Sequence, residues 1–257
     1  MNARDLIQHL YSRTPLIFGH SGAQAYTPAN TLPAFELAVQ QGADGTELDV
    51  HRSKDGHPVV IHDFTVDRET DGTGRVADLT LADLKALDAG AKFSPDFAGT
   101  RIPTLDEVFE VVGQQLVINV EIKSMGRDTD GVEEVVAQCI QRHNMQERVI
   151  ISSFNPMALR RFRAQLPDVP VGFLYAPSVP ALVIELISGF DYEAFHPEHN
   201  LIDEALVAAS HGMGHVVNAW TVNDTTRAVE LARLGVDLIM TDMPDQVRSA
   251  IQSAGLL

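Results

Sequence analysis

The chain has 257 residues, of which 45% are hydrophobic and 21% charged, as is typical of a soluble globular protein with a substantial core. Its 35 acidic and 19 basic residues give a net charge of −16, which argues against nucleic acid or anionic lipid as a partner. No apolar run approaches the ~18 residues of a membrane span, and the N-terminus lacks a secretory signal pattern. We therefore expect a cytoplasmic protein without a membrane partner. Because no linker-like stretch divides the sequence, it predicts a single domain over residues 1–257.

Short β-branched runs alternate with amphipathic helical patterns along the chain. Eight runs have the character of strands, at residues 16–20, 45–50, 116–123, 149–154, 171–176, 193–198, 215–222 and 237–242. Helical patterns lie between most of them and begin with Thr or Asn, as at 31–42, 155–166 and 223–235. Eight such units in about 250 residues predict an α/β fold, a (β/α)8 TIM barrel with its active site at the carboxyl ends of the strands. A doubly wound open sheet is the alternative that strand counting leaves open.

A ninth apolar run, residues 58–63, follows the second strand after only six residues, 52–57. This gap is too short for a parallel crossover, so the sequence predicts a hairpin-like return that leaves the barrel. The polar, glycine-rich stretch from Thr65 to Thr104 would then pass over the barrel mouth, where it could shape substrate access. We therefore expect a small insertion after the second strand, at approximately residues 56–110.

Acidic side chains gather on two of the predicted strands. Residues i and i+2 of a strand share a face, so Glu47 and Asp49 point one way, and Glu121 and Lys123 also point together. Three carboxylates at one barrel end repel one another unless a cation lies between them, and oxygen ligands suit Mg²⁺ or Ca²⁺. The alternative is a set of interior ion pairs with Lys123. A metal site is favoured because one lysine cannot balance three buried acids.

Two histidines stand at predicted strand ends beside these acids. His20 lies in the sequence GHSG, and His62 ends the ninth apolar run directly before Asp63. An imidazole titrates near ~6.5, so two of them can supply an acid and a base around neutral pH. His51 lies in a polar stretch, and we expect it to be solvated.

Seven motifs occur in a fixed order over essentially the whole chain: GHSG, PANTLPAF, GADGTELDV, SKDGHPVVIHD, VEIK, NAWTV and TDMP. In these motifs the chain resembles the glycerophosphodiester phosphodiesterase family. The resemblance implies a (β/α)8 barrel with an inserted segment after the second strand. It also implies a hydrolase of lipid metabolism that cleaves a small-molecule phosphodiester, such as glycerophosphocholine, to glycerol 3-phosphate and an alcohol. The reaction would use a divalent cation, Ca²⁺ or Mg²⁺; the alcohol released and the oligomeric state stay open.

The resemblance also implies a role for individual positions of this chain. The metal ligands would be Glu47, Asp49 and Glu121. The acid and base of the reaction would be His20 and His62. The substrate would contact Lys123, through a phosphate oxygen, and Trp220 as a wall of the pocket. Phe154, at a strand end, and Ser21, beside His20, are further expected substrate contacts.

Two positions depart from the family pattern. Relatives typically read His-Arg-Gly and Pro-Glu-Asn-Thr where this chain has Ser21 and Ala29. A serine hydroxyl cannot replace the charge of a phosphate-binding arginine, and the loss of both larger side chains would leave a wider, less positive pocket. An alternative therefore stands beside hydrolysis of glycerophosphodiesters: a barrel that only binds phosphodiesters, or a weakened or retuned enzyme for a bulkier or less charged one.

Overall fold

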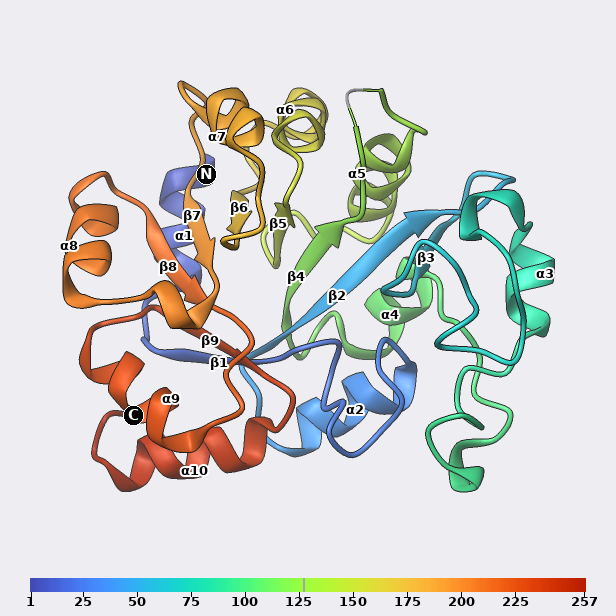
Figure 1. The fold of residues 1–257 in the computed structure, drawn as a ribbon, viewed down its shortest axis with the longest axis horizontal. Coiled ribbons are helices and arrows are strands. Elements are labelled where there is room, and N and C mark those ends of the chain that lie inside the picture. The colour runs from blue at the N-terminus through green and yellow to red at the C-terminus, as the bar shows by residue number, and fades with distance from the viewer. Residues whose placement is uncertain (127) are drawn as a thin grey trace.

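The computed structural model describes residues 1–126 and 128–257. Within these ranges eight parallel strands form a closed ring, because β1 pairs with both β2 and β9. The ring confirms the predicted TIM barrel and excludes the open sheet (Figure 1). Its strands are β1 (Leu16–Gly19), β2 (Gly45–Arg52), β4 (Val117–Ile122), β5 (Val149–Ser153), β6 (Val171–Tyr175), β7 (Ala194–Pro197), β8 (Val216–Ala219) and β9 (Leu238–Thr241).

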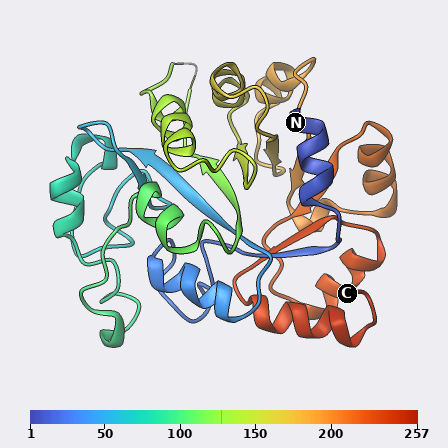
Figure 2. The ribbon, with the colours of Figure 1, turned by 180° about the vertical axis from the view of Figure 1, so that it is seen from behind.

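A helix follows each barrel strand and lies outside the ring in both views (Figures 1 and 2). These helices are α2 (Leu32–Gln40), α4 (Leu105–Val112), α5 (Val132–Arg142), α6 (Pro156–Gln165), α7 (Ala181–Ile187), α8 (Glu204–Gly212, after the 3-10 turn His199–Leu201), α9 (Thr225–Arg233) and α10 (Pro244–Ser253). The predicted cap Asn155 accepts the backbone N–H of Met157 at the start of α6. Helix α9 is capped by Asp224, one residue later than predicted. No helix in the described ranges combines the length and apolar character needed to cross a membrane.

An additional helix closes the amino-terminal end of the barrel. Ile7 on helix α1 (Ala3–Leu10) and Tyr11, directly after the helix, belong to an apolar cluster that includes Met240 on β9. The Tyr11 hydroxyl accepts a hydrogen bond from the Asn218 amide at 2.8 Å. Apolar side chains therefore fill this end, and polar side chains collect at the opposite, carboxyl end of the strands.

Residues 53–103 leave the barrel between β2 and α4. The short strand β3 (Pro58–Val60) pairs antiparallel with the end of β2, which confirms the predicted hairpin-like return. Helix α3 (Leu81–Ala86) and the 3-10 turns Val76–Asp78 and Pro95–Phe97 follow. The segment has a small apolar core of its own, formed by Val59, Ile61, Val66, Val76, Leu84 and Ile102. It is therefore a packed unit that projects from one side of the barrel (Figure 1).

Candidate active site

Three carboxylates face one another inside the barrel mouth. Glu47 and Asp49 alternate on β2, and Glu121 lies on β4 opposite Asp49 in the parallel register. All three side chains are buried, and one oxygen from each lies within 4.8 Å of the others. The intervening residues Leu48 and Val120 belong to the apolar core under the helices. The period of two along a strand therefore brings the acids to one place, as the sequence predicts.

Lys123 lies among these acids without balancing them. Its Nζ is 2.7 Å from Asp49 Oδ1 and 2.8 Å from Glu121 Oε1. Burial favours a raised pKa for Asp49, but the lysine charge overcomes this and lowers the pKa below its ordinary value. For Glu47, burial and the negative charge of Asp49 both raise the pKa. The charged form of Glu47 is therefore disfavoured until a cation offsets the repulsion, and the oxygen-only donors of the cluster fit a hard divalent cation.

The loop between β1 and α2 holds the carboxylates from one side. The Ser21 backbone N–H donates to Glu47 Oε2 at 3.1 Å, and its hydroxyl donates to Asp49 Oδ2 at 3.3 Å. The Asn30 amide donates to the same Asp49 oxygen at 2.7 Å. The Ser21 side chain is buried in this network and is not among the described residues that line the cavity between His20 and His62. Asn30 therefore helps to hold Asp49 in place, a role that the sequence did not indicate.

His20, which follows β1, is oriented by a residue from the far end of the chain. Its Nδ1 lies 2.8 Å from Asp242 Oδ1, and Asp242 also accepts hydrogen bonds from Gln24 at 2.8 Å and Asn223 at 2.5 Å. Burial favours a lowered pKa for His20, but the bond to Asp242 and the nearby charge of Glu47 outweigh burial and raise the pKa to about 9. Because Nδ1 is engaged, Nε2 is the ring nitrogen that remains for a ligand.

His62 lies on the insertion, two residues after β3 ends. Its Nδ1 is 2.7 Å from Asp63 Oδ1. Arg68 donates to both oxygens of Asp63, at 2.6 and 2.9 Å, and holds the pKa of that carboxyl well below its usual range. Glu69 accepts the backbone N–H groups of His62 at 3.2 Å and of Asp63 at 2.9 Å. This local network fixes the ring and again leaves Nε2 for a ligand.

A cavity of about 70 Å³, the central cavity, lies between the two histidines. The rings of Trp220 and Phe154 meet edge to face at 5.6 Å, and the Trp220 indole N–H donates to the carbonyl of His196 at 2.8 Å. The cavity is thus lined both by charged groups and by this aromatic pair. Its lining consists of His20, Glu47, His62, Asn119, Glu121, Lys123, Ser152, Phe154, Leu174, Trp220 and Met240.

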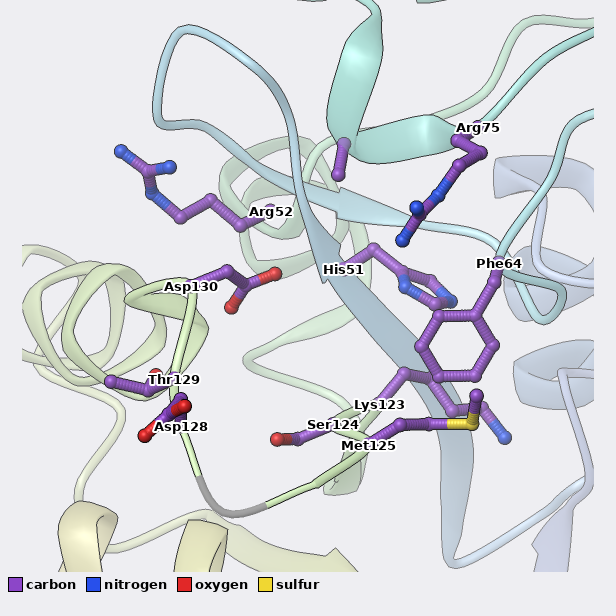
Figure 3. A pocket seen from close by; sticks show the side chains of 11 residues that line it. His51, Arg52, Phe64, Arg75, Lys123, Ser124, Met125, Asp128, Thr129 and Asp130 are labelled. Carbon is purple, nitrogen blue, oxygen red and sulfur yellow. The ribbon is translucent and has the colours of Figure 1, made fainter.

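A larger cavity of about 300 Å³ adjoins the first at Lys123, which lines both (Figure 3). His51 lines it, and the expectation that His51 is solvated is wrong. Strand β2 extends to Arg52, so His51 is buried on the same strand face as the acids of β2. Its Nε2 lies 3.1 Å from the carbonyl oxygen of His62, and its ring meets Phe64 at 4.8 Å. Burial lowers the pKa of His51 to about 4, so the ring is neutral near pH 7.

Residues 20–246 match the sequence model of the glycerophosphoryl diester phosphodiesterase family. A glycerophosphodiester phosphodiesterase of Caldanaerobacter subterraneus subsp. tengcongensis is 42% identical over 93% of this chain and 99% of the relative. One from Bacillus altitudinis is 35% identical over 90% of this chain and 95% of the relative. A solved Oleispira antarctica phosphodiesterase, in complex with the product sn-glycerol-3-phosphate, is 33% identical, with a TM-score of 0.83 over 95% of this chain and 99% of that one. The matched residues include every side chain of the central cavity.

Proposed function

Because this chain belongs to the glycerophosphoryl diester phosphodiesterase family, a family of phosphoric diester hydrolases, we propose that it hydrolyses glycerophosphodiesters to sn-glycerol 3-phosphate and an alcohol. The reaction would need a divalent cation, Mg²⁺ or Ca²⁺. The observation that carries the proposal is the shared cavity of His20 and His62 beside buried carboxylates. Binding alone needs no acid–base pair, so two oriented histidines favour turnover over a binding protein. The product in the Oleispira antarctica complex supports the same products for this chain.

The buried acids and Lys123 would bind the cation and the phosphate. Glu47, Asp49 and Glu121 would hold the cation through carboxylate oxygens, a role supported by their mutual approach within 4.8 Å. The bound cation would polarise a phosphoryl oxygen and neutralise the charge that develops on it. Lys123, between Asp49 and Glu121, would contact a second phosphate oxygen through Nζ. The edge-to-face pair of Phe154 and Trp220 would wall the glycerol side.

The two histidines would transfer the protons of the reaction. One Nε2 would take the proton from the attacking hydroxyl group, which belongs either to water or to the glycerol 2-carbon of the substrate. The other Nε2 would donate a proton to the departing alkoxide. Asp242 and Asp63 support this assignment because each binds Nδ1 and so fixes the tautomer and the direction of Nε2.

The test is the release of sn-glycerol 3-phosphate from glycerophosphocholine, with added Mg²⁺ or Ca²⁺ and with a chelator. We expect release only with the cation. Glu47→Gln, Asp49→Asn and Glu121→Gln should each raise the cation concentration for half-maximal rate by at least about tenfold, since the loss of an outer-shell partner alone costs that much.

Asp106→Asn is the matched control. Asp106 belongs, with Cys139 and His143, to another group whose atoms could bind a metal, and it begins α4 outside the barrel mouth. The cation dependence of this variant should equal that of the wild type. Full turnover after exhaustive chelation, or no release with either cation, would contradict the proposed function.

A further inference from the structure

A second large cavity adjoins the candidate active site on its aromatic side. It has a volume of about 440 Å³, and Phe154 lines both it and the central cavity. Its walls are mostly apolar and include Met157 on α6 and Leu182, Val183 and Leu186 on α7. A hollow that reaches the phosphate-binding centre through one shared aromatic ring is placed to hold a part of the substrate.

Helix α7 forms a wall of this cavity while it leaves apolar side chains in water. Leu182 is 64% exposed, although Val183, its neighbour, packs on the main core. Met125, on the loop after β4, also lines the cavity and is exposed. Exposed apolar side chains that surround a hollow are typical of a binding site for an apolar ligand. Among the described residues that line the cavity, the polar side chains are those of Ser124, Asn155 and Ser178, and none of them carries a charge.

The cavity at Lys123 has the opposite character. Arg52, Arg75 and Asp130 line it, and Figure 3 shows the guanidinium of Arg75 and the carboxylate of Asp130 directed toward the space beside His51. Met125 lies between the two cavities, because it lines both. The phosphodiester centre is therefore flanked by one cavity with charged walls and one cavity with mostly apolar walls. A phosphodiester also has two substituents on phosphorus, so the two cavities fit a substrate with one polar and one apolar substituent.

We propose that the apolar cavity between α6 and α7 binds the hydrocarbon chain of a monoacyl or monoalkyl glycerophosphodiester, that is, a lysophospholipid. This inference rests on the proposed function and extends its substrate class. The same hydrolysis breaks the bond between phosphorus and the head-group oxygen. Water supplies the hydroxyl group to phosphorus and the proton to the departing alcohol, and the second product is an acylglycerol or alkylglycerol 3-phosphate.

The first test compares glycerophosphocholine with lysophosphatidylcholines that carry hexanoyl, octanoyl and decanoyl chains, each below its micelle-forming concentration. Each methylene that enters the cavity should raise kcat/KM by up to about fourfold. The rate constant should stop rising when the chain fills the cavity. A wild-type enzyme that cleaves glycerophosphocholine but shows no rise with chain length would overturn the inference and leave the proposed function intact.

Three substitutions at two positions of α7 test whether the effect of chain length arises in this cavity. Leu182 and Ile184 are both exposed apolar residues of the same helix, but of these two only Leu182 lines the cavity. Leu182→Asp should abolish the rise with chain length and leave the rate on glycerophosphocholine unchanged. Ile184→Asp and Leu182→Met should keep the rise. Equal behaviour of the two aspartate variants would contradict the location.

A binding measurement makes the inference independent of turnover. Trp220 is the single tryptophan of the chain, and its ring contacts Phe154, the wall shared by the two cavities. Its fluorescence should report the binding of hexyl-, octyl- and decylphosphocholine, which are phosphodiesters without glycerol. The affinity should rise with chain length in the wild type and in Ile184→Asp, but not in Leu182→Asp. If the protein hydrolyses neither glycerophosphocholine nor the lysophosphatidylcholines, the proposed function fails, but this titration still tests the inference. A Kd that does not depend on chain length would overturn it.

Discussion

His20 and His62 have the same arrangement but are supported by different parts of the molecule. In both, an aspartate binds Nδ1 at 2.7–2.8 Å and leaves Nε2 for a ligand. The support of His20 comes from Asp242, 222 residues away, whereas that of His62 comes from the next residue. The His20 side chain is 26% exposed and that of His62 45% exposed. Closure of the barrel builds the first pair, and a local network on the insertion builds the second.

The difference indicates how each pair should respond to change. Asp242 accepts hydrogen bonds from three side chains on two segments, His20 and Gln24 between β1 and α2 and Asn223 after β8, so its position depends on the packed barrel end. Asp63 is held by Arg68, and Glu69 independently binds the backbone of His62. His62 should therefore keep its position after the loss of Asp63 better than His20 does after the loss of Asp242.

Removal of either imidazole should have the largest effect. His20→Ala and His62→Ala should each lower kcat on glycerophosphocholine by at least ~10²-fold, the scale of one general acid or base. His57→Ala, an exposed histidine on the turn between β2 and β3, is the control and should keep the wild-type rate. A wild-type kcat for either cavity variant would remove that histidine from the mechanism.

Replacement of the aspartate that binds each histidine should lower kcat by a smaller factor, and the factor should differ between the two histidines. Asp242→Asn should lower kcat by about tenfold, as for an outer-shell partner, and Asp63→Asn by less. Asp242→Asn should also shift the pH–rate profile to lower pH, because the lost charge no longer raises the pKa of His20. Steady-state rates between pH 5 and 10 on both variants measure this, and a larger loss in Asp63→Asn would reverse the comparison.

The remaining effect concerns the stability of the cation-free protein and not its rate. The pKa of His20 is raised to about 9 in the folded state, so the protonated ring stabilises the fold. This contribution is complete below the unfolded value of ~6.5 and disappears as the pH rises through about 9. The free energy of unfolding should therefore fall more in wild type than in His20→Gln over this range, by on the order of 2 kcal/mol. Urea titrations at pH 6 and pH 10 measure it, and an equal fall in both proteins would disprove the contribution.

Local periodicity was sufficient to predict the acids but not their supports. The period of two places Glu47, Asp49 and Glu121 on inward faces, and parallel pairing brings β2 beside β4. The same period applies to His51, whose burial the sequence could have indicated; the polar neighbours misled because β2 continues to residue 52. The contact of Asp242 with His20 depends on pairing of β1 with β9, which no local pattern specifies.

The path of the insertion could be predicted from the sequence, but its apolar core could not. Its departure from the barrel follows from a gap too short for a crossover, and its antiparallel return is confirmed. The apolar residues between Val59 and Ile102 are spaced irregularly, so their common core could not be recognised without the fold. The apolar cavity beside α7 was also missed, because its walls come from three separate segments that only the barrel brings together.

The most direct test of the central claim, that one histidine acts as acid and the other as base, is the dependence of the rate on the leaving group. Wild type, His20→Ala and His62→Ala would be assayed on two glycerophosphodiesters that differ only in choline and 4-nitrophenol as the leaving alcohol. A 4-nitrophenolate leaves without a proton, so the variant that lacks the acid should recover most of its kcat on this substrate, while the variant that lacks the base should not. Recovery in both variants, or in neither, would contradict the division of roles.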